Sequence, residues 1–165
     1  MLFSIGAITV MASAIVAYHF HSGYPENHSL IYNYFWQKNF TSQVLNGEIY
    51  PRWLYGTMDG LGAPVFYYYA PLPFYLFTFI SILFGNFGGD FTVLTIGHFS
   101  IYTLSGLAFY AFIKTLVECR WAVAMSVLYM VLPYHYIDLE VRGALGEASA
   151  YIWLPLIIKY LLKSG

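Results

Sequence analysis

The chain has 165 residues, of which 59% are hydrophobic, 21% aromatic and only 9% charged, and its net charge is −1. This composition is typical of proteins with several membrane-spanning segments and excludes an ordinary soluble domain. The near-zero charge gives no sign of a nucleic-acid partner, and the single cysteine, Cys119, excludes an intrachain disulfide and a cysteine-based zinc cluster. We therefore expect an all-α, polytopic transmembrane helical bundle in which residues 1–165 form one membrane domain in contact with lipid.

The first apolar segment covers residues 2–18, a length that suits a transmembrane helix. It has no basic start, but residues 12–14, Ala-Ser-Ala, match a signal-peptidase site, so a cleaved signal peptide is the alternative. The mostly apolar run continues through residues 16–20, which favours a helix that is retained.

A polar block follows at residues 20–64, and we expect it to be an external loop. Asn27 or Ser29 as N-cap and Gly47 as C-cap predict a helix that runs to about Asn46. Its many aromatic residues suit a helix that lies at the level of the lipid headgroups. The Pro- and Gly-containing stretches after it predict tight turns.

The segment at residues 65–84 is dominated by Tyr and Phe and is interrupted by Pro71 and Pro73. These prolines favour a re-entrant segment that dips into the membrane and returns, and a plain transmembrane helix is the alternative.

Three more apolar segments predict transmembrane helices, at residues 91–113, 121–133 and 148–162. Between the last two lies a second polar block at residues 134–147, which we expect to be an external charged loop. It holds five ionisable residues between positions 135 and 147. Since charge in or beside hydrocarbon is costly, a membrane protein tends to keep such groups for a function.

The basic residues indicate how the chain crosses the membrane. Lys114 and Arg120 flank one short connection, and Lys159 and Lys163 lie at the end of the last helix. The positive-inside rule places both pairs in the cytoplasm. The two polar blocks then share the outer face if the segment 65–84 returns to the side from which it entered, which is the arrangement we expect. A spanning helix there would separate them.

Two motifs resemble a known family. Residues 47–75 contain GEIYPRW and GLGAPVFYYYAPLPFY, which resemble G-x-x-x-P-R-W followed by G-x-G-x-P-x-F-x-x-Y-x-P-L. Residues 134–147, YHYIDLEVRGALGE, resemble Y-R-x-x-D-L-Y-x-R-G-A-x-x-E, with His135 where Arg is common. Both look like hallmarks of the bacterial integral membrane family labelled "6-pyruvoyl-tetrahydropterin synthase-related", which is similar to the C-type glycosyltransferase superfamily. The resemblance covers most of residues 27–162.

The resemblance implies the N-terminal part of a larger protein of the bacterial inner membrane, with an outward-facing site between the first external loop and a later one. It implies the use of a polyprenyl-phosphate sugar, so we expect transfer of a sugar to an acceptor on the outer face. A non-catalytic scaffold or lipid-binding subunit of the same fold is the alternative. The remaining helices of that protein, or other membrane subunits, are the expected partners. Pterin chemistry is not indicated, because the sequence shows no zinc-binding His cluster and no soluble barrel pattern.

Sugar transfer from a lipid phosphate requires a carboxylate that deprotonates or orients the acceptor and positive charge that stabilises the departing phosphate. The candidate carboxylates are Glu26, Asp59 and Glu147, and the candidate phosphate ligands are Arg142 and Arg52. Members of the superfamily usually carry an Asp early in the first external loop. This chain departs from that pattern, since Glu26 is the acid available there.

His28, Asp138 and His135 are candidates for supporting roles. Each site residue also has a structural interpretation: Arg142 pairs with Asp138 at helical spacing, Glu147 stabilises a helix N-terminus, and His135 makes a hydrogen bond inside the bundle. The structural interpretation of Asp59 is that it is a turn residue. The metal ligands and the cofactor stay open, and a divalent metal ion is one candidate. His98, within a predicted helix, is interpreted as a hydrogen-bonded polar group between helices.

Overall fold

The computed structural model describes residues 2–24, 26–85 and 91–164. Over these ranges the chain consists of helices and turns, with one isolated antiparallel bridge between Leu54 and Ala63, so the expected all-α class is confirmed. The elements in chain order are α1 (Leu2–Ser22), α2 (Leu30–Leu45), η1 (Met58–Gly60), α3 (Val65–Tyr68), α4 (Leu72–Phe84), α5 (Thr92–Ile113), α6 (Cys119–Met130), α7 (Pro133–Tyr136), η2 (Ile137–Arg142) and α8 (Leu145–Ser164).

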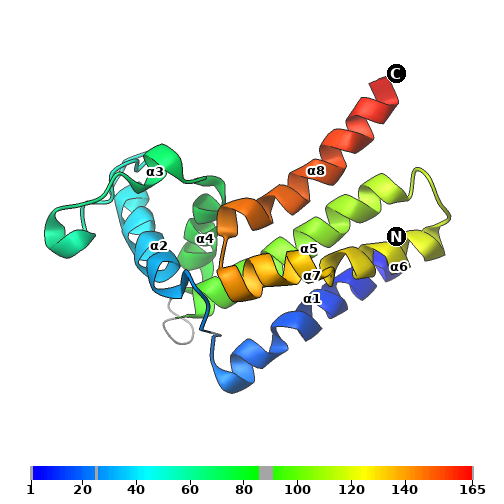
Figure 1. Ribbon diagram of the computed structural model, residues 1–165, viewed down its shortest axis with the longest axis horizontal. Coiled ribbons are helices and arrows are strands. Elements are labelled where there is room, and N and C mark those ends of the chain that lie inside the picture. Colours follow the sequence, from blue (N-terminus) through cyan, green and yellow to red (C-terminus); the bar gives the residue numbers. More distant parts are fainter. Residues whose placement is uncertain (1, 25, 86–90, 165) are drawn as a thin grey trace.

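Helix α5 lies at the centre of a bundle, and α1, α4, α6 and α8 all pack against it. In Figure 1, α1, α5 and α6 run side by side, and both termini lie toward the right. Glycines on α5 allow close approach. A Cβ atom on Gly97 would lie 2.2 Å from Phe77 Cε1, and one on Gly106 would lie 2.5 Å from Met130 Sδ. Small residues at helix contacts are characteristic of membrane bundles.

Within the described residues, three helices are long and apolar enough to cross a membrane: Leu2–His19 within α1, Thr92–Ile113 and Leu145–Lys163 within α8. They correspond to the first, third and fifth apolar segments of the sequence. A fourth span results if Cys119–Met130 and Pro133–Arg142, which are bent by 48° at their junction, count as one broken span. These features are consistent with a membrane protein.

The helix predicted at 121–133 lies earlier in the chain than expected, because α6 begins at Cys119 and ends at Met130. Pro133 lacks an N–H group and disfavours a helical conformation in the residue before it, and Leu132 accordingly has an extended ψ of 136°. A helix then resumes directly at Pro133. Residues 134–147, which we expected to form an external charged loop, are therefore mostly helical.

The physical reason lies in the burial of η2, a π-helix in which Asp138, Leu139 and Glu140 are buried. In an apolar bundle the backbone has to satisfy its own hydrogen bonds, and a helix does so where an open loop does not. The π-helix ends at Arg142, and the next residue, Gly143, has a φ of +65° in the left-handed region that favours glycine. This turn leads the chain directly into α8.

The segment at 65–84 is divided into two helices. The short helix α3 ends at Tyr68, and α4 begins at Leu72 with Pro73 in its first turn. Helix α4 has 13 residues. That length corresponds to about 20 Å, whereas the hydrocarbon core of a bilayer is about 30 Å thick. A single helix of this length does not cross a bilayer, and the re-entrant arrangement stays a prediction.

Aromatic rings join these short helices to α2. Phe40 of α2 contacts Phe66 of α3 with ring centroids 4.7 Å apart, and Phe66 contacts Phe74 of α4 at 4.8 Å. Helix α2 begins after Ser29, which is one of the two predicted N-cap positions, but the Ser29 side chain makes no capping hydrogen bond. Gly47 follows the end of the helix with a φ of +96°. Its exposed face carries large apolar side chains, which suits contact with headgroups; they include Ile31, Tyr32, Phe35 and Leu45.

The two polar blocks of the sequence contact each other. The backbone N–H of His28 donates to the carbonyl of Val141 at 3.0 Å, and Asn33 Nδ2 donates to the carbonyl of Gly143 at 2.8 Å. In Figure 1, α2, α3 and α4 gather at the end of the bundle where α8 begins. The blocks therefore lie at one end of the bundle, as the shared-face arrangement requires. The side of the membrane on which that end lies stays a prediction.

Candidate functional site

A pocket of about 460 Å³ lies at this end of the bundle, where the two polar blocks meet. It brings together three of the residues that the sequence singles out, namely His28, Arg142 and Glu147. The complete lining consists of His28, Ser29, Tyr68, Tyr69, Ala70, Arg142, Ala144, Gly146 and Glu147.

Arg142 connects two carboxylates beside this pocket. Its Nη1 donates to Glu147 Oε2 at 2.7 Å and its Nη2 donates to Glu147 Oε1 at 2.9 Å, so the pair is bidentate. Nη1 also contacts Asp138 Oδ1 and lies 3.3 Å from the Tyr134 hydroxyl. The side chain of Asp138 is 1% exposed, against 37% for Arg142 and 56% for Glu147. Arg142 is therefore held on one side by the buried Asp138, and on the other side it contacts Glu147, which is exposed and lines the pocket.

Tyr69 closes the pocket from the α3 side. Its hydroxyl accepts a hydrogen bond from the backbone N–H of Gly146 at 3.4 Å, and its ring lies 5.4 Å from that of Trp36. Burial raises the pKa of the Tyr69 hydroxyl above its ordinary value, so the group stays protonated and neutral near pH 7. The neutral hydroxyl can therefore both donate and accept hydrogen bonds, and it adds no charge to the pocket.

The other predicted charged residues lie outside this pocket lining. Glu26 is exposed on the segment before α2, and Asp59 is exposed in the η1 turn with a φ of +55°. The Arg52 guanidinium lies over the rings of Tyr50 and Tyr67, with distances of 4.8 and 5.7 Å to the ring centroids. The structure therefore brings Glu147 to Arg142 but places Glu26, Arg52 and Asp59 elsewhere.

His135 is buried in the bundle and does not line the pocket. Its ring stacks on that of Tyr151 with centroids 4.0 Å apart and planes inclined by 6°. Its Nδ1 lies 3.1 Å from the carbonyl of Tyr129, to which it donates. This arrangement corresponds to the structural alternative, a hydrogen bond inside the bundle.

A second group, which sequence reasoning missed, consists of His19, His98 and Glu140. His19 Nε2 lies 2.9 Å from Glu140 Oε2, and His98 Nδ1 lies 3.4 Å from Glu140 Oε1. Two tyrosine hydroxyls complete the group: that of Tyr18 donates to Glu140 Oε2 at 2.6 Å, and that of Tyr24 lies 2.7 Å from His98 Nε2. The available signal is the presence of ionisable side chains in or beside apolar segments, which is rare without a function.

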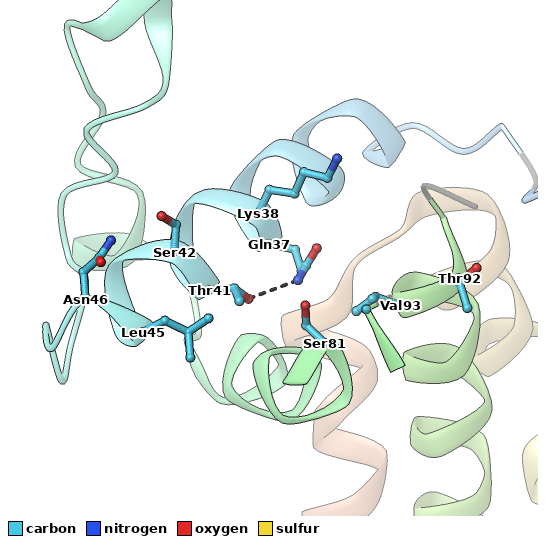
Figure 2. Close-up of a pocket in the computed structure, with 10 residues that line it drawn as sticks. Gln37, Lys38, Thr41, Ser42, Leu45, Asn46, Ser81, Thr92 and Val93 are labelled. Atoms are coloured by element: carbon cyan, nitrogen blue, oxygen red, sulfur yellow. Dashed lines mark hydrogen bonds between the residues drawn. The ribbon is translucent and has the colours of Figure 1, made fainter. Parts of the chain in front are cut away.

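A larger pocket, of about 690 Å³, lies between α2, the end of α4 and the start of α5. Figure 2 shows its polar lining, in which Gln37 Nε2 donates to Thr41 Oγ1 at 3.0 Å. The lining contains none of the predicted site residues. Besides Lys38, its polar side chains are hydroxyls and amides, and it includes no carboxylate or histidine for acid–base chemistry. We therefore place the candidate site at the smaller pocket.

Comparisons of the chain with family models, curated proteins and solved structures found no match.

Proposed function

We propose that this chain is part of a C-type membrane glycosyltransferase, which moves a sugar from a polyprenyl-phosphate donor to an acceptor on the outer face of the bacterial inner membrane. The observation that carries the proposal is the bidentate contact between Arg142 and Glu147 at the mouth of a pocket where both polar blocks meet. It joins a phosphate-binding group and a carboxylate, the two groups that the reaction requires.

The guanidinium of Arg142 presents a flat pair of N–H groups to the two oxygens of Glu147. A phosphate offers two oxygens in a similar geometry, so it competes with Glu147 for the same donors. When a lipid phosphate binds Arg142, the carboxylate of Glu147 is released inside the same pocket. Donor binding thus produces the free base where the acceptor has to be activated.

The reaction then balances as follows. The acceptor hydroxyl oxygen forms a bond to the anomeric carbon of the sugar, while the bond from that carbon to the phosphate oxygen breaks. The proton of the hydroxyl passes to Glu147, and the polyprenyl phosphate leaves with the bonding electron pair. Arg142 stabilises the negative charge that develops on this phosphate. The neutral hydroxyl of Tyr69 and the ring of His28 line the same pocket and are placed to position the sugar.

The surroundings of the pocket suit a lipid substrate. The pocket lies at the end of a bundle with three helices that are long and apolar enough to cross a membrane. Tyr67 and Tyr68, beside and in the pocket lining, are 58% and 90% exposed. Tyrosine at such positions favours the region between headgroups and hydrocarbon, where the phosphate of a polyprenyl lipid lies.

The test uses the full chain in nanodiscs that contain polyprenyl phosphate. We expect Arg142→Ala to weaken binding by at least about tenfold, whereas Arg52→Ala, which removes an arginine outside the pocket, leaves it unchanged. Glu147→Gln is expected to bind as tightly as the unchanged protein or more tightly, because it removes the competing carboxylate. Equal binding by the Arg142→Ala variant and the unchanged protein contradicts the proposal.

The catalytic part is tested with radiolabelled polyprenyl-phosphate hexoses in membranes that contain the protein. We expect Glu147→Gln to abolish sugar transfer while binding persists, and Glu26→Gln, at an exposed acid outside the pocket, to retain it. Transfer at the original rate by the Glu147→Gln variant excludes Glu147 as the base.

A non-catalytic lipid-binding or scaffold subunit of the same fold is the second candidate. One observation favours it: Arg142 already has two carboxylate partners, Asp138 and Glu147, so its charge is compensated without a ligand. In that case Arg142→Ala lowers the stability of the protein without a selective effect on polyprenyl phosphate.

A further inference from the structure

Three buried side chains from distant parts of the sequence converge inside the bundle. His19 is 5% exposed, His98 is 0% exposed and Glu140 is 3% exposed. They come from the end of α1, from α5 and from η2. Two imidazoles and a carboxylate are the donor set of zinc sites with two histidines and one glutamate.

The spacing of the donor atoms fits a shared metal ion. One ligand atom from each of His19, His98 and Glu140 can be chosen so that all lie within 4.8 Å of one another. Zinc binds nitrogen and oxygen at about 2.0–2.2 Å, so neighbouring ligands in a tetrahedral site are about 3.3 Å apart. The distances of 2.9 Å from His19 and 3.4 Å from His98 to the Glu140 oxygens lie close to that value. These two contacts reach different oxygens of Glu140, so enclosing an ion requires ligand atoms that now lie within 4.8 Å of one another to approach to about 3.3 Å.

Two of the candidate ligand atoms lack a hydrogen bond. Among the described residues, Glu140 Oε1 and His98 Nδ1 find no hydrogen-bond partner although they are buried and face each other across 3.4 Å. Buried polar atoms without a partner are costly and uncommon, and an ion bound between them removes the cost. The remaining contact is the hydrogen bond between His19 Nε2 and Glu140. A metal ion that binds between these two atoms replaces the proton that they share.

The outer contacts also match a metal site. Ligating histidines and carboxylates in such sites are oriented by further hydrogen bonds. Here the Tyr24 hydroxyl lies 2.7 Å from His98 Nε2, which leaves Nδ1 directed at the centre. The Tyr18 hydroxyl donates to Glu140 Oε2 at 2.6 Å. Glu140 itself lies in a π-helix, a rare conformation that occurs frequently at functional sites.

We propose that His19, His98 and Glu140 form a binding site for a zinc ion, which connects α1, α5 and η2. The sequence shows no His cluster because the three ligands are separated by long stretches of chain, and only the fold assembles them. The ion fixes the position of η2, and thereby of Arg142 two residues after Glu140. The proposal does not depend on sugar transfer.

The test measures zinc in the full chain, purified in detergent, stripped with a chelator, reloaded with zinc chloride and desalted. We expect about one zinc ion per chain in the unchanged protein and in His28→Asn, which removes a histidine outside the group. Glu140→Gln and His98→Asn are expected to lose it. Bound zinc raises the melting temperature of the unchanged protein and of His28→Asn only.

A second measurement needs no variant and therefore does not depend on the folding of one. Cobalt(II) added to the stripped protein is expected to give the visible absorption of a four-coordinate nitrogen and oxygen site, and zinc displaces it. Absence of this absorption together with no retained zinc overturns the proposal and leaves a proton-linked His–Glu group. Loss of the zinc in His28→Asn also overturns it, because the ion is then bound at the surface.

Discussion

Arg142 binds two acids of different character, the buried Asp138 and the exposed Glu147, with one guanidinium group. The first contact lies within the π-helix turn, and the second spans the Gly143 turn to the first turn of α8. The arginine therefore joins η2 to α8 and at the same time faces the pocket.

This asymmetry predicts unequal effects on stability. Asp138→Asn is expected to lower the free energy of unfolding by about 1.5–3 kcal/mol, because a buried hydrogen bond between charged groups is weakened. Glu147→Gln is expected to cost less than about 1 kcal/mol, because the pair is exposed to solvent. Thermal unfolding in detergent measures both. A larger loss for Glu147→Gln would show that the α8 contact is the structural one.

Close packing of α4 on α5 gives a second prediction. A Cβ atom on Gly97 would overlap the ring of Phe77, whereas one on Gly6 in α1 would meet no atom within 4 Å. Gly97→Ala is therefore expected to destabilise the protein by about 1–3 kcal/mol, as overpacking does in a tight core. Gly6→Ala serves as the matched control and is expected to be neutral or stabilising. Equal melting temperatures for the two variants would contradict this packing.

The junction between the polar blocks depends on Asn33. Its side-chain amide is buried and donates to the carbonyl of Gly143 at 2.8 Å. Asn33→Ala leaves that carbonyl without this donor and is expected to cost about 1–3 kcal/mol. Asn39→Ala, which removes a hydrogen bond to the Phe35 carbonyl within α2, is expected to cost less. Limited proteolysis of the α2 region measures the difference, and similar cleavage of both variants would argue against the junction.

Alkaline pH provides a fourth prediction. Burial, followed by the charge of Glu140, raises the pKa of Tyr24 above its ordinary value of 10.0. The neutral hydroxyl is then favoured in the folded state, so its contribution to stability is complete below about pH 10 and is lost as the pH rises toward the folded pKa. Tyr24→Phe lacks this titration. We expect its melting temperature to fall less steeply than that of the unchanged protein above about pH 10. If the two melting temperatures fall in parallel with pH, the raised pKa of Tyr24 is refuted.

The arrangement in the membrane gives a fifth prediction. Single cysteines at Glu26 and Glu147, in a Cys119→Ser background, are both expected to react with an impermeant thiol reagent in intact cells. A cysteine at Lys114 is expected to react only after the membrane is opened, because the positive-inside rule places it in the cytoplasm. Reaction at only one of the two acidic positions would mean that the chain crosses the membrane between them.

Much of the helical framework followed from local properties of the sequence. The apolar segments that became α1, α5 and α8 were predictable because membrane spans depend on length and lack of charge, which a sequence displays directly. The break before Pro133 also has a local cause, namely the missing N–H and the steric effect on the preceding residue. The helical form of residues 134–147 was not predictable in this way, since it depends on burial against other helices.

The candidate site likewise has one part that local sequence predicts and another that depends on tertiary packing. Arg142 and Asp138 are four residues apart, so their pairing was predictable from helical spacing. The contact between Arg142 and Glu147 was not, because it spans the Gly143 turn. The sequence by itself therefore determined the helical class and the Asp138–Arg142 pair. Only the tertiary structure decided that Glu26, Arg52 and Asp59 lie outside the pocket lining, and that His19, His98 and Glu140 come together. Contacts between distant residues depend on how the helices pack around α5, and that packing reflects side-chain shape along whole helices.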